Sequence, residues 1–437
     1  MFAKLSSIFK NKEMRKRILF TLGMLFIFRL GTQIPAPNVD TSNLGDSNGL
    51  IAMMNLLGGG AMDKMSILAL GVTPYITASI ILQLLSMDVI PHLTELSKSG
   101  QSGRKVIDKY TRYLGVILAF IQGYTMTFVI TNSDQTSALI NQGVAGHLYV
   151  ATVFTAGTMF LLWIADRISM HGIGNGVSMI IFAGIVADIP YQFMEAFRSL
   201  TTGLSGSAFF NGILSFSGFV LVYLLIIVLV VFVQTAVRKI PIQYTSSTLT
   251  TKKNDMTYLP LKINSASVIP VIFSSAVMIA PVTIVQLLIN NNVITANGFT
   301  KTMTTLLNMQ SPESLAIYVV LIILFTFFYT KLVVDPEKIA ENLQKSGTYI
   351  PGVHPGKETK DYVNKVLSRI TVLGALSLAV IAILPHIAPM LIPSLPNSIK
   401  MGGTGLIIVV GVAMETVAQM EGKVTQKAYR GFLGIGR

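Results

Sequence analysis

Residues that could carry out metal or nucleophilic chemistry are scarce in this chain. There is no cysteine, which excludes disulfides, thiolate metal sites and thiol nucleophiles. None of the histidines stands in an H-E-x-x-H pair or another metal-binding spacing. The five are His92, His147, His171, His354 and His386. We therefore predict a protein that is not an enzyme and that uses no metal and no cofactor.

Two glycine-rich strings resemble nucleotide-binding loops but lack the residues that such loops need. The string at 172–176 (GIGNG) does not match the dinucleotide fingerprint, and no strand pattern precedes it. Gly356-Lys357-Glu358 lacks both the upstream glycine and the Ser/Thr of a phosphate-binding loop. Without a site for ATP, any energy for transport must come from a partner or an ion gradient.

The remaining candidates are charges that lie in or beside apolar runs. Arg29 lies near the end of the first run, Asp166 and Asp188 lie at the ends of two others, and Glu415 is the only carboxylate well inside one. A buried charge costs about 2.5–3.5 kcal/mol on insertion scales, so each needs a polar partner. The relay of ionisable groups typical of ion-coupled carriers is missing from the sequence.

The apolar runs that hold these residues are long enough to cross a membrane. The chain is 51% hydrophobic and 12% charged, whereas soluble domains are about one quarter charged. Because a span needs roughly 20 apolar residues and only helices or closed barrels satisfy their backbone in lipid, we predict an all-α integral membrane protein with ten transmembrane helices. The predicted spans are 18–36, 71–88, 113–131, 149–166, 177–190, 214–234, 266–289, 314–334, 370–391 and 402–420. The first resembles a signal peptide, but it ends in Pro35-Ala36-Pro37 without a cleavage site, so we predict that it stays uncleaved.

The basic residues predict the orientation of these spans. Of the 33 Lys and Arg residues, 28 lie in segments on the same side as the N-terminus. Only Lys64, Arg198, Lys301 and Lys400 lie on the other side, and Arg29 lies within the first span. The positive-inside rule therefore predicts that both termini are cytoplasmic. The net charge of +13 reflects this topology, and it does not indicate a nucleic-acid binder.

Three connecting segments are too long or too apolar to be simple turns. The segments 235–265 and 335–369 exceed about 12–15 residues, the length beyond which loops are usually functional. In the second we predict helices at Asp335–Lys345 and Thr359–Leu367, and we expect both segments to be ordered docking surfaces. The segment Gly49–Met65 is too short to span and too apolar for a free loop, which predicts a re-entrant or cavity-filling segment.

Several strings, in order along the chain, resemble the family of SecY, the channel subunit of the bacterial Sec protein translocase. They are 71–80 (GVTPYITASI), 102–105 (SGRK) with 110–113 (YTRY), 171–178 (HGIGNGVS), 259–264 (LPLKIN), 268–270 (VIP), 340–347 (AENLQKSG) and 351–356 (PGVHPG). The resemblance implies two pseudo-symmetric five-helix halves, residues 1–200 and 201–437, around a central protein-conducting channel. Unfolded preproteins would cross through this channel, and transmembrane segments would leave sideways into lipid. Inverted repeats of this kind are known from transporters.

The resemblance also implies four functional groups of residues. An apolar pore ring seals the channel, since a narrow apolar constriction gates by dewetting and needs no charge; it comprises Val72, Ile76, Val177, Ile181, Ile272 and Ile408. A plug, about 50–64, closes the channel from outside through Leu50, Ile51, Met53, Met54, Leu56, Leu57, Gly58, Gly59, Gly60, Ala61 and Met62. A lateral gate between the second and seventh spans, which carry small and polar residues suited to a separable seam, includes Thr77, Ile80, Gln83, Asn264, Ser267 and Val268. A docking surface for SecA and the ribosome includes Arg238, Lys239, Lys252, Lys253, His354 and Lys357.

One residue of the docking surface departs from the family pattern. The family usually carries Arg between the two Pro-Gly pairs, and this chain has His354 there. Neutral His lacks both the permanent charge and the guanidinium fork of Arg. A direct transfer of the arginine's role in motor coupling is therefore not implied.

The resemblance implies partners as well as residues. They are the SecE and SecG subunits, the SecA ATPase, the ribosome, signal peptides and unfolded preproteins, and membrane lipid, with SecDF and YidC as further partners. The implied location is the bacterial cytoplasmic membrane. Two other interpretations stay open on the sequence: a ten-span solute carrier, which the scarcity of mid-membrane charges disfavours, and an insertase or scaffold without a pore.

Overall fold

The computed structural model describes residues 11–40, 60–62, 64–87, 89–131, 139–141, 143–202, 206–244, 257–290, 298, 302–303, 306, 312–391 and 397–432. Each of the ten predicted spans falls on a helix, and α5 (Pro91–Lys98) and α13 (Pro336–Lys345) are additional short helices. The ten are α2 (Lys12–Gly31), α4 (Thr73–Leu85), α6 (Gln101–Thr131), α7 (Val144–His171), α8 (Gly176–Thr201), α9 (Ser207–Thr235), α10 (Ile269–Asn290), α12 (Pro312–Val333), α14 (Lys357–Leu391) and α15 (Asn397–Phe432). The prediction of ten membrane-spanning helices is confirmed.

Several of these helices are longer than the predicted spans. The fifth span was predicted over 177–190, but α8 continues through Pro190 to Thr201. Helix α14 joins the predicted segment 359–367 to the predicted span 370–391, because no helix-breaking residue separates them. With 35 residues it is roughly 50 Å long at 1.5 Å per residue, so it extends well beyond a hydrocarbon core of about 30 Å.

Short polar side chains fix where three of the helices begin. The side chains of Asn11, Asn175 and Asp335 each accept a hydrogen bond from a backbone N–H in the first turn of α2, α8 and α13, respectively. Such caps satisfy donors that the helix itself leaves unpaired. Proline occupies the first turn of α4, α5 and α13, where its missing N–H has no cost.

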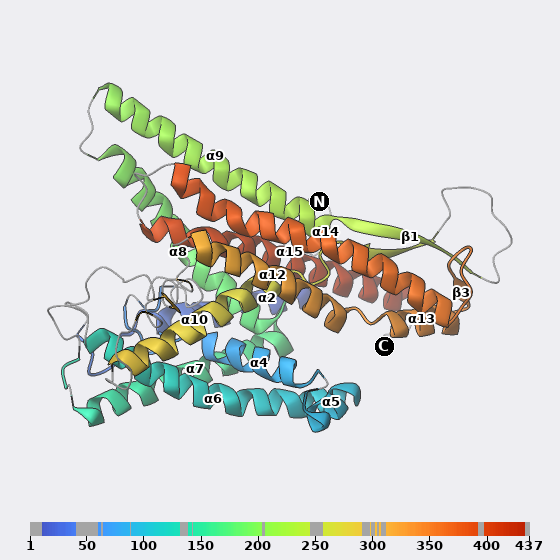
Figure 1. Cartoon of the computed structure of the whole chain (residues 1–437), viewed down its shortest axis with the longest axis horizontal. Helices are drawn as coiled ribbons and strands as arrows, with labels where there is room; N and C mark the ends of the chain where they lie inside the picture. Colours follow the sequence, from blue (N-terminus) through green and yellow to red (C-terminus); the bar gives the residue numbers. More distant parts are fainter. Residues whose placement is uncertain are drawn as a thin grey trace.

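A small sheet lies at one end of the molecule, beside α13 (Figure 1). Strand β1 (Val237–Tyr244) pairs antiparallel with β2 (Thr257–Lys262), from Val237↔Lys262 to Ile242↔Thr257, and with β3 (Thr348–Tyr349) on its other edge. The all-α prediction omitted this sheet. Its signal is a short period-2 pattern in β1, in which Ile240 and Ile242 are buried and Pro241 between them is exposed.

The helices meet along two lines of contact that join early and late parts of the chain. Helix α10 packs against α4 and α6 as well as against α12. Helix α8 packs against α2 and α7, and also against α9 and α15. In Figure 1, α4, α6 and α7 lie on one side of the molecule, and α9, α14 and α15 lie on the other. With the predicted boundary at residue 200, the contacts of α10 with α4 and α6, and of α8 with α9 and α15, would lie between the two halves.

Candidate functional site

The six residues of the predicted pore ring belong to one hydrophobic cluster. Five of them are buried, and Val177 is partly buried and packs against the cluster. They come from four elements that are distant in the sequence, namely α4 with the residue before it, α8, α10 and α15. The fold therefore gathers these side chains in the interior of the molecule.

Close packing of α15 shows which way its ring residue faces. A Cβ atom at Gly405 would lie 2.8 Å from Ile185 Cγ2 on α8, and one at Gly411 would collide with Val268 beside α10. Ile408 lies between these two contacts, on the same face of α15, because residues three apart are neighbours on a helix. The ring residue Ile181 is one turn from Ile185, and Ile272 is one turn from Val268. The three Ile side chains therefore point toward a common interior.

The predicted lateral gate coincides with the contact of α10 against α4 and α6. Thr77 and Ile80 on α4 are buried, and so are Asn264 and Val268 near the start of α10. Ser267 adopts a positive φ of 57° directly before Val268. All six predicted gate residues lie in or next to these helices.

Polar atoms in this seam are buried without hydrogen-bond partners. Gln83 Nε2 donates to Ser79 Oγ at 3.1 Å and Asn264 Nδ2 donates to the Ser267 carbonyl at 2.9 Å, so both amides bond within their own segments. Their oxygen atoms have no partner in the part of the chain that the structure describes. Leaving a buried acceptor unpaired costs about 1–3 kcal/mol, so these two amides are imperfectly satisfied in this structure.

Two further buried polar residues on these helices were not among the predicted gate residues. Thr73 Oγ1 on α4 and Gln122 Oε1 on α6 are also buried without a partner among the described residues. Together with Gln83 and Asn264 they make up four of the six such atoms, and all four lie on the segments that meet at α10. A glutamine within an apolar run was the signal for Gln122, but its neighbours across the seam were not readable from the sequence.

Most of the predicted plug, Leu50–Gly59, lies outside the described residues. The described end of the plug, Gly60 to Met62, leads into a buried segment in which Ala61, Met62 and Met65 are at most 1% exposed. The backbone N–H of Ala36 donates to the Met65 carbonyl at 2.8 Å, which ties this segment to the chain that follows α2. The described end of this segment is therefore packed inside the molecule, and its cavity-filling role stays a prediction.

The predicted docking residues lie around a second, smaller hydrophobic core. Ile240, Leu261, Leu343, Ile350 and Val363 are among its members, and they join the sheet, α13 and the start of α14. Arg238, Lys239, His354 and Lys357 are exposed around this core, whereas Lys252 and Lys253 lie outside the described residues. The core holds an otherwise polar region together at one end of the molecule (Figure 1).

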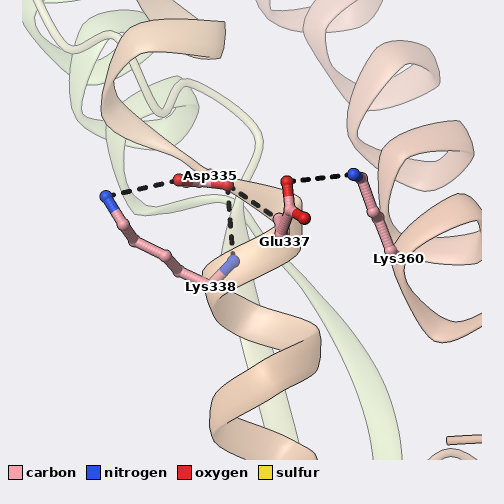
Figure 2. A network of polar contacts seen from close by, with 4 residues as sticks. All are labelled: Asp335, Glu337, Lys338 and Lys360. Atoms are coloured by element: carbon pink, nitrogen blue, oxygen red, sulfur yellow. Dashed lines mark hydrogen bonds and ion pairs between the residues drawn. The ribbon is translucent and has the colours of Figure 1, made fainter. Parts of the chain in front are cut away.

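One ion pair joins α13 to α14 in this region, and a second links the N-cap residue of α13 to its first turn. Glu337 pairs with Lys360 of α14 at 3.0 Å, and Asp335 pairs with Lys338 at 3.4 Å (Figure 2). Burial raises the pKa of the Asp335 carboxyl, but hydrogen bonds from Lys338 and from the Glu337 N–H, with the Lys338 charge, outweigh burial and lower that pKa below its usual value. The cap of α13 is therefore ionised at neutral pH.

The backbone of the loop that carries His354 is also tied down. The His354 N–H donates to Glu358 at 3.3 Å, and the Thr359 hydroxyl donates to the His354 carbonyl at 2.8 Å. The imidazole itself is exposed. The loop thus presents the side chain of residue 354 to the outside from a fixed backbone.

Ten membrane-spanning helices around a shared hydrophobic core, with a smaller domain at one end, define a polytopic helical membrane protein. The family model named SecY matches residues 66–417. The chain belongs to the SecY family. It is 43% identical to the protein translocase subunit SecY of Staphylococcus aureus, over 99% of this chain and 100% of that protein.

Solved structures share the fold at low sequence identity. A structure described as that of a protein conducting channel aligns with a TM-score of 0.66 and 15% identity, covering 93% of this chain and 91% of that one. Sec61 in the canine ribosome-channel complex from the endoplasmic reticulum aligns with a TM-score of 0.61 and 14% identity, over 93% and 91% of the two chains.

Proposed function

We propose that this chain is the central channel-forming subunit of a bacterial Sec translocon, which passes unfolded preproteins across the membrane and releases transmembrane segments into lipid. The gathering of six apolar side chains from four elements in one interior cluster carries this proposal. An apolar ring excludes water and ions, and it yields to a moving chain because it makes no strong bonds to it.

Membership of the SecY family supports the remaining parts of the proposal. The side chains of Gln83 and Asn264 support a lateral gate. Their nitrogens bond within their own segments and their oxygens have no partner among the described residues, so neither side chain has a described hydrogen bond that a separating seam would break. The described end of the segment 50–64 supports a plug. We place both termini and the end that carries the sheet in the cytoplasm, on the charge distribution.

The partners follow from the same proposal. Sec61, a fold neighbour, has been seen in complex with a ribosome. Arg238, Lys239, Lys252, Lys253, His354 and Lys357 form the proposed docking surface for the ribosome and the SecA ATPase. Contacts of the basic residues with ribosomal RNA phosphates would weaken as salt rises. SecE and SecG would complete the channel, with SecDF and YidC as further partners.

Reconstitution tests the function directly. Liposomes that contain this chain with SecE are expected to accumulate protease-protected preprotein when SecA and ATP are added. Liposomes without this chain are the control. Preprotein that stays fully protease-sensitive in the complete system would contradict the proposal.

The same assay tests residue 354. His354→Arg restores a fixed charge on a loop with a tethered backbone, so we expect transport that is no slower and up to about fivefold faster, the factor that an exposed ion pair is worth. His354→Gln, which cannot carry a charge, is the matched control and is expected to transport at the unmodified rate. A large loss in His354→Arg would show that the imidazole has a role of its own.

A further inference from the structure

Helix α8 carries a carboxylate that the proposed ring does not use. Asp188 lies seven residues beyond the ring residue Ile181, so the two share a face of the helix about 10 Å apart along its axis. The Asp188 side chain is 29% exposed. A charged group therefore lies on the ring-facing side of α8, toward the end of the molecule where the plug segment enters.

The backbone of the plug segment rests on this carboxylate. Gly60 has a φ of 73°, and a Cβ atom there would lie 3.0 Å from Asp188 Oδ1 and 3.2 Å from Oδ2. The left-handed backbone favours glycine, and a Cβ atom at this position would press against the carboxylate. The described residues 60–62 and 64–66, named here the plug stem, therefore begin in contact with Asp188 of α8.

The other end of the plug stem is fixed to the chain that follows α2. Ala36 donates to the Met65 carbonyl, the Ile67 N–H donates to the Ile34 carbonyl at 3.0 Å, and Lys64 donates to Gln33. In the last turn of α2, Arg29 Nη2 lies 3.9 Å from Asp188 Oδ1. The ion pair thus joins the two helices between which the plug stem is held.

We infer that the Arg29–Asp188 pair positions the plug: it fixes α8 against α2 and presents the carboxylate edge on which the plug stem docks in the closed channel. This inference rests on the proposed plug. Burial of Ala61 and Met62 stabilises the docked stem but does not by itself specify one docked position. The ion pair and the Gly60 contact do specify one position, because both involve the single carboxylate of Asp188.

Asp188→Asn tests the inference, since it removes the charge and keeps the shape. We expect ion leak through the closed channel in planar bilayers to rise about two- to fivefold, the factor that a partly exposed ion pair is worth. Met62→Cys provides a second readout in a chain that has no other cysteine. Its maleimide alkylation, slow because residue 62 is buried, is expected to accelerate by a similar factor when Asp188→Asn is added.

Asp166→Asn is the matched control. It removes an ion pair of the same kind, Arg112–Asp166 at 2.8 Å, from the contact of α6 with α7. Neither leak nor alkylation of Cys-substituted position 62 is expected to change. Arg29→Gln should reproduce Asp188→Asn, and the double variant should add little to either, because both act on one pair.

Replacing residues 50–64 separates this inference from the plug proposal. If Asp188→Asn raises the leak by the same factor in the plug-replaced channel, the pair does not act through the plug and the inference is wrong. If plug replacement raises the leak but Asp188→Asn changes neither leak nor alkylation, the plug stands and the positioning role falls. If plug replacement leaves the leak unchanged, the plug proposal is wrong. If Asp188→Asn also fails to raise the alkylation rate at position 62, the proposed contact of the stem with Asp188 is wrong as well.

Discussion

Replacing residues 50–64 by a Gly/Ser linker of the same length is expected to leave a folded channel whose idle ion conductance is raised on the order of tenfold or more, because the apolar ring alone then has to exclude ions. The helices stay packed because the contacts of α2 with α7 and of α4 with α6 do not involve this segment. The linker keeps the connection from α2 to α4 and removes only the apolar filling. Single-channel recording in planar bilayers measures the effect.

The comparison with simple deletion controls for strain. Deletion of 50–64 also removes the plug but shortens the connection, so both variants should conduct and the linker variant should express better. Equal conductance of the unmodified and linker-replaced channels would contradict the plug. A chain that conducts in neither form would instead support an insertase or scaffold without a pore.

Bridging α4 to α10 is expected to abolish protein export. The chain has no cysteine, so Gln83→Cys with Asn264→Cys introduces the only two thiols. A short bismaleimide should join them in the idle channel, since α10 packs against α4. Helices held together by packing can separate, but α4 and α10 cannot separate once they are covalently bridged. We therefore expect transport of preprotein to fall by about tenfold or more.

A second cysteine pair controls for the chemistry of the bridge. The pair Arg112→Cys with Asp166→Cys joins α6 to α7. In the unmodified chain the side chains of Arg112 and Asp166 are 2.8 Å apart, and these two helices are not proposed to separate. Transport through this bridged channel should stay near the unmodified rate, and each single-cysteine variant should be unaffected by the reagent. Full export after positions 83 and 264 have been crosslinked would contradict the lateral gate.

Local chemistry made much of the fold readable. A span is a property of some 20 consecutive residues, so each of the ten predicted spans coincides with a helix. The helix α13 was predicted over Asp335–Lys345, and it occupies Pro336–Lys345. The fifth span was predicted to end at residue 190, but α8 continues through Pro190 to Thr201.

The pore ring and the gate were named from family motifs, and their residues stay proposals. Taken one at a time, Ile181, Ile272 and Ile408 look like ordinary core residues. Composition cannot distinguish a side chain that lines a seal from one that packs a core. Their common cluster depends on how four elements approach one another.

The sequence by itself determined the membrane class, the number of helices, the predicted orientation and the absence of thiols, since each is a sum over neighbouring residues or over the whole chain. Only the tertiary structure decided the pairing of β1 with β2 and β3, the orphaned atoms of Thr73, Gln83, Gln122 and Asn264, and the seat of Gly60 on Asp188. These features join residues far apart in the chain, and a contact of that kind is set by how helices pack. Whether a buried amide finds a partner, or a carboxylate meets a backbone, is therefore fixed by the fold and not by the residue alone.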